Sequence, residues 1–225
     1  MTLSVGNLAR HFGAVPILEG VELKLHPNTL TLLTGRNGSG KSTLVNCVTG
    51  FDRHYQGCVA IGPQRMDKYG PEVRARRGLV RTFQYPHLFP SMAVRENIAI
   101  GYCAKRFSLD SYFHRFSNLV DAGGSLTNLG LRPLEKRKAD ALSFGEMKLV
   151  NLARALTNGP RYLLLDEPLA SLHGERREAV VSAIVDCKKQ GAGILVIEHR
   201  VPDLIPHADA ALELRDGRLF PRDTR

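Results

Sequence analysis

A glycine-rich segment, GRNGSGKST at residues 35–43, directly follows the apolar run TLTLL and fits the pattern GxxxxGK[ST]. Its glycines let consecutive backbone amides curl into an anion-binding nest at the start of a helix. A lysine in this pattern reaches the β- and γ-phosphates, and the serine hydroxyl can ligate Mg²⁺. A simple turn between a strand and a helix does not require lysine and serine at these offsets. The segment predicts a nucleoside triphosphate site formed by Gly35, Arg36, Asn37, Gly38, Ser39, Gly40, Lys41, Ser42 and Thr43.

Two adjacent carboxylates end a second apolar run, RYLLLDEP at residues 161–168. Charges at the end of a buried strand are costly unless they meet a cation or a proton. Beside a phosphate loop, we expect Asp166 to hold Mg²⁺ through water and Glu167 to polarise the attacking water. A third apolar run ends at His199, a residue type that is more often packed or solvated than catalytic. Its position at a neighbouring strand end makes it a candidate for the same site.

A third segment with possible chemistry is LSFGEMKLVNLARAL at residues 142–156, which reads as an amphipathic helix. Ser143 and Glu146 have the spacing of a capping box, so local structure alone explains them. A capped helix N-terminus also presents free amides and a positive dipole end, which suit an anion. Phe144 is an unusual residue for this turn, and neither interpretation requires it.

The elements that must position these groups follow an α/β pattern, because short apolar runs alternate with longer amphipathic stretches. The runs at 29–35, 161–167 and 193–199 are continuously apolar, as expected for parallel strands that are covered on both faces. Ligands bind beyond the carboxyl ends of such strands, so the three polar strand ends predict one shared crevice. Residues 175–190 have a helical period, and Gly191 can close that helix.

Residues 85–141 differ from the rest of the chain, because Pro86, Pro90 and the glycine pair at 123–124 interrupt helix-like stretches without a strong strand. We predict a helical subdomain at 85–141. It would be inserted into a nucleotide-binding core of residues 1–84 and 142–225, within a single domain that spans 1–225.

Composition narrows the classes of protein that this chain can be. Its 225 residues are 43% apolar, which is typical of a globular protein, and no run of about 18 uncharged apolar residues could cross a bilayer. The N-terminus lacks the order of a secretory signal, so we expect a cytosolic chain. The four cysteines are scattered without CxxC spacing, which disfavours metal and disulfide sites.

The net charge of +9 suits an anionic lipid surface, a nucleic acid or a phosphate ligand, and does not choose among them. Two basic clusters contribute to it. We expect both to be solvated faces, with attraction to an anionic membrane as a further option. The clusters are Arg74, Arg76, Arg77 and Arg81, and Arg132, Lys136, Arg137 and Lys138.

The phosphate loop, the glutamine of RTFQ (residues 81–84), LSFGE, LLLDEP and the histidine of IEH resemble, in order and separation, the motifs of an ABC-type ATPase. The resemblance covers nearly the whole chain. It implies a P-loop NTPase core with a mainly parallel sheet, an N-terminal antiparallel β region and an inserted helical subdomain. Its cofactors would be ATP and Mg²⁺.

The same resemblance implies roles for individual residues. Ser42, Gln84 and Asp166 would ligate Mg²⁺, Gln84 would also touch the attacking water, and His199 would contact the γ-phosphate. Phe12 in RHFG would stack on adenine.

In this family two chains form a head-to-tail dimer that sandwiches two ATP molecules. Ser143, Gly145 and Glu146 would then bind the γ-phosphate held by the other chain.

Two positions depart from the usual pattern, namely Phe144, where glycine is usual, and His173 in LASLH, where aspartate is usual. Both changes are similar to variants in the ATPases of branched-chain amino acid importers. The segment RTFQYPHLFPSMAVRENIAIG at 81–101 resembles that branch as well.

The function that the resemblance implies is an ATP-hydrolysing subunit that powers import of branched-chain or similar amino acids. Its partners would be transmembrane permease subunits, a second ATPase chain and an exported solute-binding protein, at the cytoplasmic face of the membrane, and no nucleic acid is expected. Three alternatives remain open at this point. They are an exporter ATPase, a soluble ABC ATPase in cofactor assembly or nucleic-acid and translation work, and a non-hydrolysing subunit of a mixed dimer.

Overall fold

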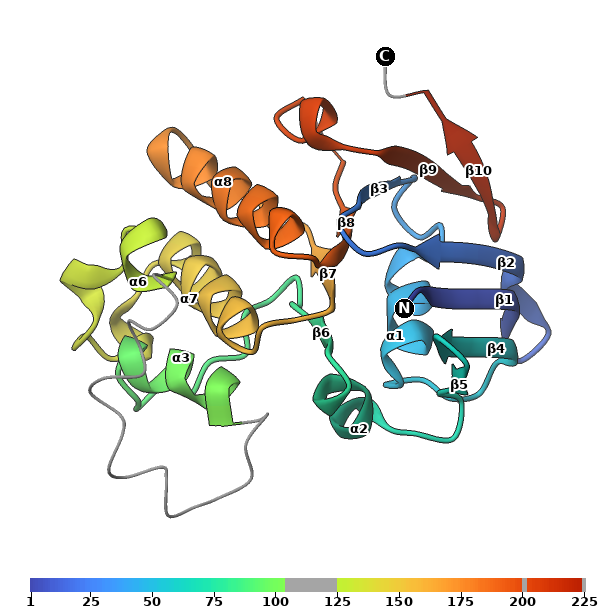
Figure 1. Ribbon diagram of the computed structural model, residues 1–225, viewed down its shortest axis with the longest axis horizontal. Helices are drawn as coiled ribbons and strands as arrows, with labels where there is room; N and C mark the ends of the chain where they lie inside the picture. Colours follow the sequence, from blue (N-terminus) through green and yellow to red (C-terminus); the bar gives the residue numbers. More distant parts are fainter. Residues whose placement is uncertain (104–124, 200–201, 224–225) are drawn as a thin grey trace.

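The computed structural model describes residues 1–103, 125–199 and 202–223, which form two β-sheets and two groups of helices (Figure 1). The smaller sheet is antiparallel, with the strand order β2-β1-β4-β5. Its strands are β1 (Leu3–Phe12), β2 (Val15–Leu25), β4 (Gln56–Ile61) and β5 (Gln64–Arg65). This sheet confirms the expected N-terminal antiparallel region.

The larger sheet has the order β10-β9-β3-β8-β7-β6, and all of its neighbouring strands are parallel except β9 and β10. Its strands are β3 (Leu30–Thr34), β6 (Leu79–Arg81), β7 (Tyr162–Asp166), β8 (Gly193–Ile197), β9 (Ala210–Arg215) and β10 (Arg218–Arg222). Every residue of β3, β7 and β8 is buried, as the continuous apolar runs predict.

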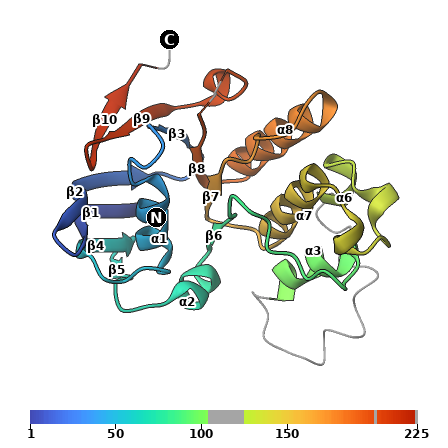
Figure 2. The ribbon, with the colours of Figure 1, turned by 180° about the vertical axis from the view of Figure 1, so that it is seen from behind.

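Side chains alternate along these central strands and enter two separate cores. Leu163 and Leu165 of β7 pack with the helices α7 and α8, whereas Tyr162 and Leu164 pack with the antiparallel sheet and α1. A strand sends successive side chains to opposite faces, so the central sheet serves both cores at once. Figure 2 shows this division, with α1 and the antiparallel strands on one side and α3, α6, α7 and α8 on the other.

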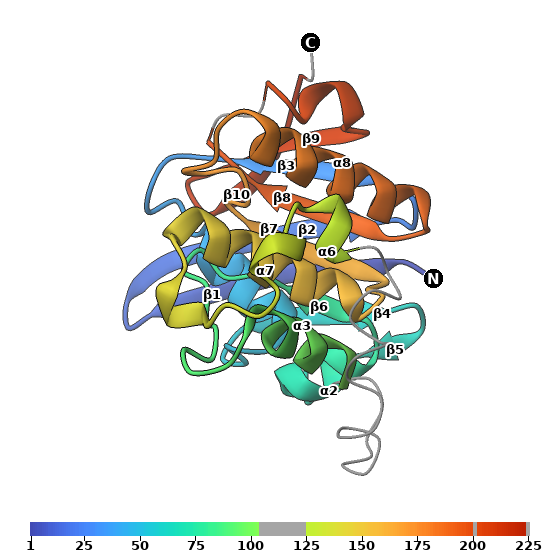
Figure 3. The ribbon, with the colours of Figure 1, turned by 90° about the vertical axis from the view of Figure 1, so that its left-hand side faces the viewer.

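The described helices lie on both sides of the central sheet. They are α1 (Lys41–Thr49), α2 (Pro71–Arg76), α3 (Val94–Cys103), α6 (Ser125–Asn128), α7 (Phe144–Thr157) and α8 (Glu175–Lys189), with short 3₁₀ turns at Arg132–Leu134, Ala139–Ala141 and Ile205–His207. Figure 3 views the chain from the helical side, where α7 and α8 lie in front of the parallel strands. The helix α8 matches the expected helical period.

The helix α7 follows directly after the predicted boundary at residue 141. It packs along α3 and also contacts α6. Leu149 and Leu152 of α7 share one apolar cluster with Val94, Ile98 and Leu126, and the same cluster includes residues of β7 and β8, so α7 packs against both parts of the chain. The glycine pair at 123–124 lies outside the described residues.

Within the described residues, no helix is both long and apolar enough to span a bilayer.

Candidate active site

The carboxyl ends of β3, β7 and β8 meet around an open cavity of about 550 Å³. The sequence predicts one crevice at these strand ends, and the structure brings their polar groups together there. The lining residues are Phe12, Ile17, Asn37, Gly38, Gly40, Lys41, Ser42, Thr43, Gln84, Asp166, Glu167 and His199.

The loop between β3 and α1 needs glycine at two of its tightest points. Gly35 has a φ of 151°, and a Cβ on it would lie 2.5 Å from the backbone oxygen of Leu214. Gly40 precedes α1 with a φ of 100°, in the left-handed region that suits glycine. The loop therefore curls tightly enough to direct backbone groups at the helix N-terminus, which is the cradle that a polyphosphate requires.

Lys41 is the first residue of α1, and its amino group is held inside the loop. It donates hydrogen bonds of 2.8 and 2.9 Å to the backbone oxygens of Gly35 and Arg36. Burial lowers the pKa of this amine, while the carboxylates of Glu167 and Asp166 oppose that shift. Ser39 Oγ is buried nearby without a hydrogen-bond partner among the described residues. A buried hydroxyl with no partner in this loop is consistent with a polar ligand at the site.

Asp166 ends β7 as a buried carboxylate. Its Oδ2 lies 3.8 Å from an Nη atom of Arg81, and its backbone amide donates to Thr82 Oγ1 over 3.4 Å. Burial raises the pKa of Asp166 above its ordinary value of 3.8, although Arg81 opposes the shift. A carboxylate in such surroundings gains when a cation binds beside it. Ser42 and Gln84 supply hydroxyl and amide oxygens to the same cavity, so the available donors are the oxygen ligands that Mg²⁺ prefers.

Glu167 connects three elements of the cavity through its side chain. Its carboxylate accepts a 3.0 Å hydrogen bond from Gln84 Nε2, and Oε1 lies 3.3 Å from His199 Nε2. Its backbone is in the left-handed region, with a φ of 50°, which is uncommon for a residue other than glycine. Residues that are far apart in the sequence thus converge on one carboxylate that faces the cavity.

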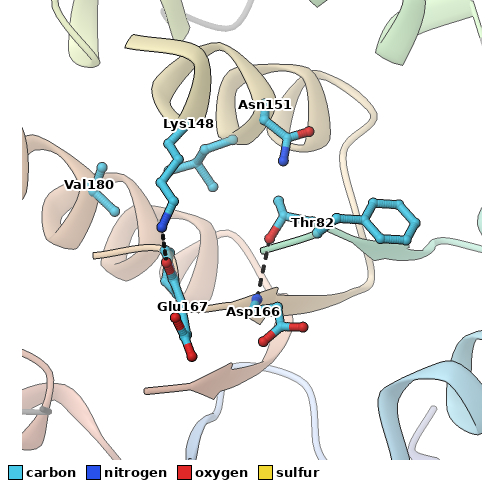
Figure 4. Close-up of a pocket in the computed structure, with 9 residues that line it drawn as sticks. Thr82, Lys148, Asn151, Asp166, Glu167 and Val180 are labelled. Atoms are coloured by element: carbon cyan, nitrogen blue, oxygen red, sulfur yellow. Dashed lines mark hydrogen bonds between the residues drawn. The ribbon is translucent and has the colours of Figure 1, made fainter. Parts of the chain in front are cut away.

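Behind these carboxylates, Lys148 of α7 reaches the backbone of the same loop. Its Nζ donates to the backbone oxygen of Glu167 over 2.7 Å and to that of Ala170 over 3.0 Å. Figure 4 shows this lysine descending from α7 to Glu167, beside the bond between Thr82 and Asp166. A small cavity of about 10 Å³ lies among these side chains.

The turn at the start of α7 is a capping box, as the sequence predicts. Ser143 Oγ accepts from the backbone amide of Glu146, and the Glu146 carboxylate accepts from the backbone amide of Ser143 at 2.8 Å. This backbone bond and the Ser143 hydroxyl lower the pKa of Glu146, and Arg176 adds an ion pair at 3.2 Å. Gly145 lies against Leu172.

The capping turn does not share the cavity with the phosphate loop. Its residues Ser143, Gly145 and Glu146 are not among those that line it. Phe144 is 37% exposed, and its ring centroid lies 6.1 Å from that of Tyr85, the residue after Gln84. The first turn of α7 therefore presents an open face, and it is connected to the glutamine segment by an aromatic contact.

Phe12 also lines the cavity and is 52% exposed. The guanidinium of Arg10 lies 4.4 Å from its ring centroid, and Asp52 holds that guanidinium at 2.7 Å. An aromatic ring that is backed by a fixed cation and open to a cavity can stack on a flat ligand.

Some residues that shape the site were misjudged or missed from the sequence. Arg74 and Arg81 were expected on a solvated face, but Arg74 is fully buried and the Arg81 side chain is 7% exposed. Arg74 donates to the backbone oxygens of Cys47 and Val48 at the end of α1, and Arg81 donates to Asn46 on the same helix. Lys148 was not predicted as part of the site, because a lysine near the start of a helix is usually exposed to solvent.

Comparison with known proteins agrees with this geometry. Residues 18–170 match the family model described as "ABC transporter". The chain is 33% identical to the "Probable branched-chain amino acid transport ATP-binding protein LivG" of Methanocaldococcus jannaschii, over 97% of this chain and 88% of that protein. A solved structure of a nucleotide-free ATP-binding cassette from an ABC transporter superposes with a TM-score of 0.83 at 32% identity, covering 98% of this chain and 90% of the other.

The chain belongs to the ABC transporter family. It is an ATP-binding cassette, the ATPase subunit that drives transport, and the predicted fold class and enzyme class are confirmed. ATPase subunits of this family work with permeases and dimerise. The chain is also 32% identical to "Ribose import ATP-binding protein RbsA 2" of Streptomyces avermitilis, and it spans 43% of the length of that relative.

Proposed function

We propose that the cavity at the strand ends binds MgATP and hydrolyses it to power import of branched-chain or similar amino acids. The single observation that carries the catalytic part is the convergence of the phosphate loop, both strand-end carboxylates, Gln84 and His199 on one cavity of about 550 Å³. A volume of this size is in the range of ligand pockets.

The phosphate loop is the part of the cavity that fits a triphosphate. Backbone amides of residues 35–43 hold the phosphates, Lys41 exchanges its bonds to the Gly35 and Arg36 carbonyls for phosphate oxygens, and Phe12 stacks on adenine. Ser42, Gln84 and Asp166 would hold Mg²⁺. The ion, when bound, neutralises charge on the phosphate oxygens.

Hydrolysis requires a group that takes a proton from water. Glu167 performs this step, because its carboxylate faces the cavity and is fixed from both sides by Gln84 and His199. When ATP is bound, His199 would contact the γ-phosphate. The contact with Gln84 links this carboxylate to the segment that leads into the helical layer.

The open face of the capping turn supports a second role for α7. We propose that the turn of Ser143, Gly145 and Glu146 binds the γ-phosphate of an ATP held by a partner chain in a head-to-tail dimer, with the Glu146 carboxylate retained in the capping box that shapes the turn. The free amides and positive dipole end of α7 favour that anion. Phe144 at 37% exposure leaves the turn accessible, and His173 lies in the exposed loop after the carboxylates.

The transported solute is proposed from the relatives. The chain covers 88% of the relative that is called a branched-chain amino acid transport ATP-binding protein, but only 43% of the ribose import relative. This difference favours amino-acid import over ribose import. The partners would be permease subunits that contact residues 85–141 and α7, a second ATPase chain and an exported solute-binding protein, at the cytoplasmic face of the membrane. An exporter ATPase or a soluble ABC ATPase would have the same nucleotide site, so the site alone does not decide between them and an importer.

Glu167→Gln tests the proposal, because it keeps the size of the side chain and one accepting oxygen but removes the base. We expect the turnover of ATP to fall by about 10²-fold or more while the affinity for ATP stays within a few-fold. The same change in cells should abolish uptake of labelled leucine and leave ribose uptake intact. Unchanged hydrolysis would remove Glu167 from its role, and loss of ribose uptake alone would redirect the substrate to sugars.

A further inference from the structure

Lys148 joins the helix that begins at the LSFGE turn to the loop that carries Glu167. Its ammonium donates to the backbone oxygen of Glu167 at 2.7 Å (Figure 4). It also donates to the backbone oxygen of Ala170 at 3.0 Å and lies 5.4 Å from the centroid of the Phe144 ring. Charge-assisted hydrogen bonds of this kind are stronger than neutral ones and fix geometry more firmly. One side chain therefore holds both ends of the segment 167–170.

This segment needs support, because its backbone is in an unusual conformation. Glu167 has a φ of 50°, and Ser171, directly after the segment, has a φ of 65°; residues other than glycine seldom adopt such values. The Glu167 amide is already bonded to the Ile197 oxygen at 2.9 Å. The bond from Lys148 to the carbonyl of the same residue fixes the other peptide plane, so the direction of the Glu167 side chain depends on both.

Lys148 is buried, which is unusual for a lysine side chain. Lys148 is 8% exposed, and among the described residues it forms no ion pair within 4 Å. Burial lowers its pKa, while the fields of Glu198, Glu167 and Asp166 oppose that shift. A buried ammonium that donates its hydrogen bonds to two backbone carbonyls is suited to hold the backbone of that segment in place.

We infer that Lys148 is a positioning residue, which orients the Glu167 carboxylate for catalysis and couples it to α7. The inference rests on the proposed function of Glu167. Because the first turn of α7 would face a nucleotide held by the partner chain, a shift of α7 on binding there moves the Glu167 carbonyl through Lys148. Each site of the dimer would thus sense the occupancy of the other.

Lys148→Met tests this inference, because methionine keeps an unbranched stem of similar length and removes all three donors. We expect kcat for ATP to fall about tenfold or more while the dissociation constant for ATP stays within about twofold. Lys148→Arg, which keeps charge and donors, should retain most of the activity. Lys24→Met makes the same chemical change at an exposed lysine of β2, and it should leave both constants unchanged.

A double-mutant cycle separates positioning from simple support of the fold. If Lys148 acts through Glu167, adding Lys148→Met to Glu167→Gln should cause little further loss in single-turnover hydrolysis. An equal loss in both backgrounds, or an unchanged kcat in Lys148→Met, overturns the inference. Lys148→Gln answers the same question if the methionine variant does not fold. Hydrolysis by the parent chain and its loss in Glu167→Gln are measured in the same series, so failure of the proposed function is recognised separately.

Discussion

At the scale of single residues, neighbouring carboxylates in this site occupy different surroundings. Asp166 is buried beside Arg81, whereas Glu167 faces the cavity between Gln84 and His199. Position in the strand explains the contrast, since Asp166 is the last strand residue and Glu167 the first of the loop. One environment suits a cation ligand and the other a base, so adjacent residues of similar chemistry can serve separate roles.

The raised pKa of Asp166 leads to a prediction about stability in the absence of nucleotide and Mg²⁺. Folding favours the protonated form of this group, so its contribution to the free energy of unfolding is greatest below the ordinary pKa of 3.8 and is lost as the pH rises through the raised pKa. At pH 7 the parent chain therefore carries a buried charge that Asp166→Asn lacks.

We expect Asp166→Asn to melt higher than the parent at pH 7, by on the order of 3 °C, and the gap to narrow as the pH falls toward about 4. Thermal unfolding followed by circular dichroism across this range is the measurement. A parent chain that melts higher at every pH would show that the ion pair with Arg81 outweighs burial.

Sequence patterns located the charged groups of the site but not all of their supports. Lys41, Asp166 and Glu167 could be predicted because strands, glycines and charges stand at fixed local offsets. Arg74 and Lys148 could not, because nothing local distinguishes a buried basic residue from a solvated one. Their partners are backbone carbonyls of other segments, and these come near only in the folded chain.

At the scale of elements, the helix α1 depends on support at both of its ends. Its N-terminus carries the phosphate loop, and its C-terminal carbonyls of Cys47 and Val48 accept hydrogen bonds from Arg74 at 2.8 and 2.6 Å. Carbonyls at a helix end have no partner within the helix. Arg74 also donates to the backbone oxygens of Met66 and Tyr69, so it fastens α1 to the segment before α2.

Arg74→Leu removes these donors and leaves several buried carbonyls without partners. Each costs about 1–3 kcal/mol, so we expect a loss of about 3–5 kcal/mol and a fall in melting temperature on the order of 10 °C. Arg53→Leu, at an exposed arginine, is the matched control and should change stability by less than about 0.5 kcal/mol. Equal melting temperatures for the two variants would show that water or other groups replace Arg74.

The sequence predicted the central strands and the long helices better than it predicted their assembly. Continuous apolar runs gave β3, β7 and β8, and helical periodicity gave α7 and α8. The pairing of β6 with β7 was not predicted, since residues 79 and 162 meet only in the folded chain. The packing partners of α7 were likewise not predicted, because an amphipathic pattern shows that a face is buried and not what covers it.

At the scale of the whole molecule, the site joins segments that are distributed over most of the chain. The central sheet brings together the phosphate loop after β3, the carboxylates at the end of β7 and His199 after β8, while the antiparallel sheet contributes Phe12. The helical group lies on the other face of the central sheet, and the open turn at the start of α7 is where we propose the second nucleotide contact. Under the proposed head-to-tail arrangement, a single chain would supply two separate halves of a site, and two chains would be needed to complete one.

The most direct test of this account is light scattering of purified Glu167→Gln with and without MgATP. We predict a mass near that of the 24.9 kDa chain without nucleotide and about twice that mass with MgATP, because slow hydrolysis traps the dimer. With MgADP the mass should stay that of one chain. A mass of one chain at saturating MgATP, with binding verified by calorimetry, would contradict the claim that ATP joins two of these chains.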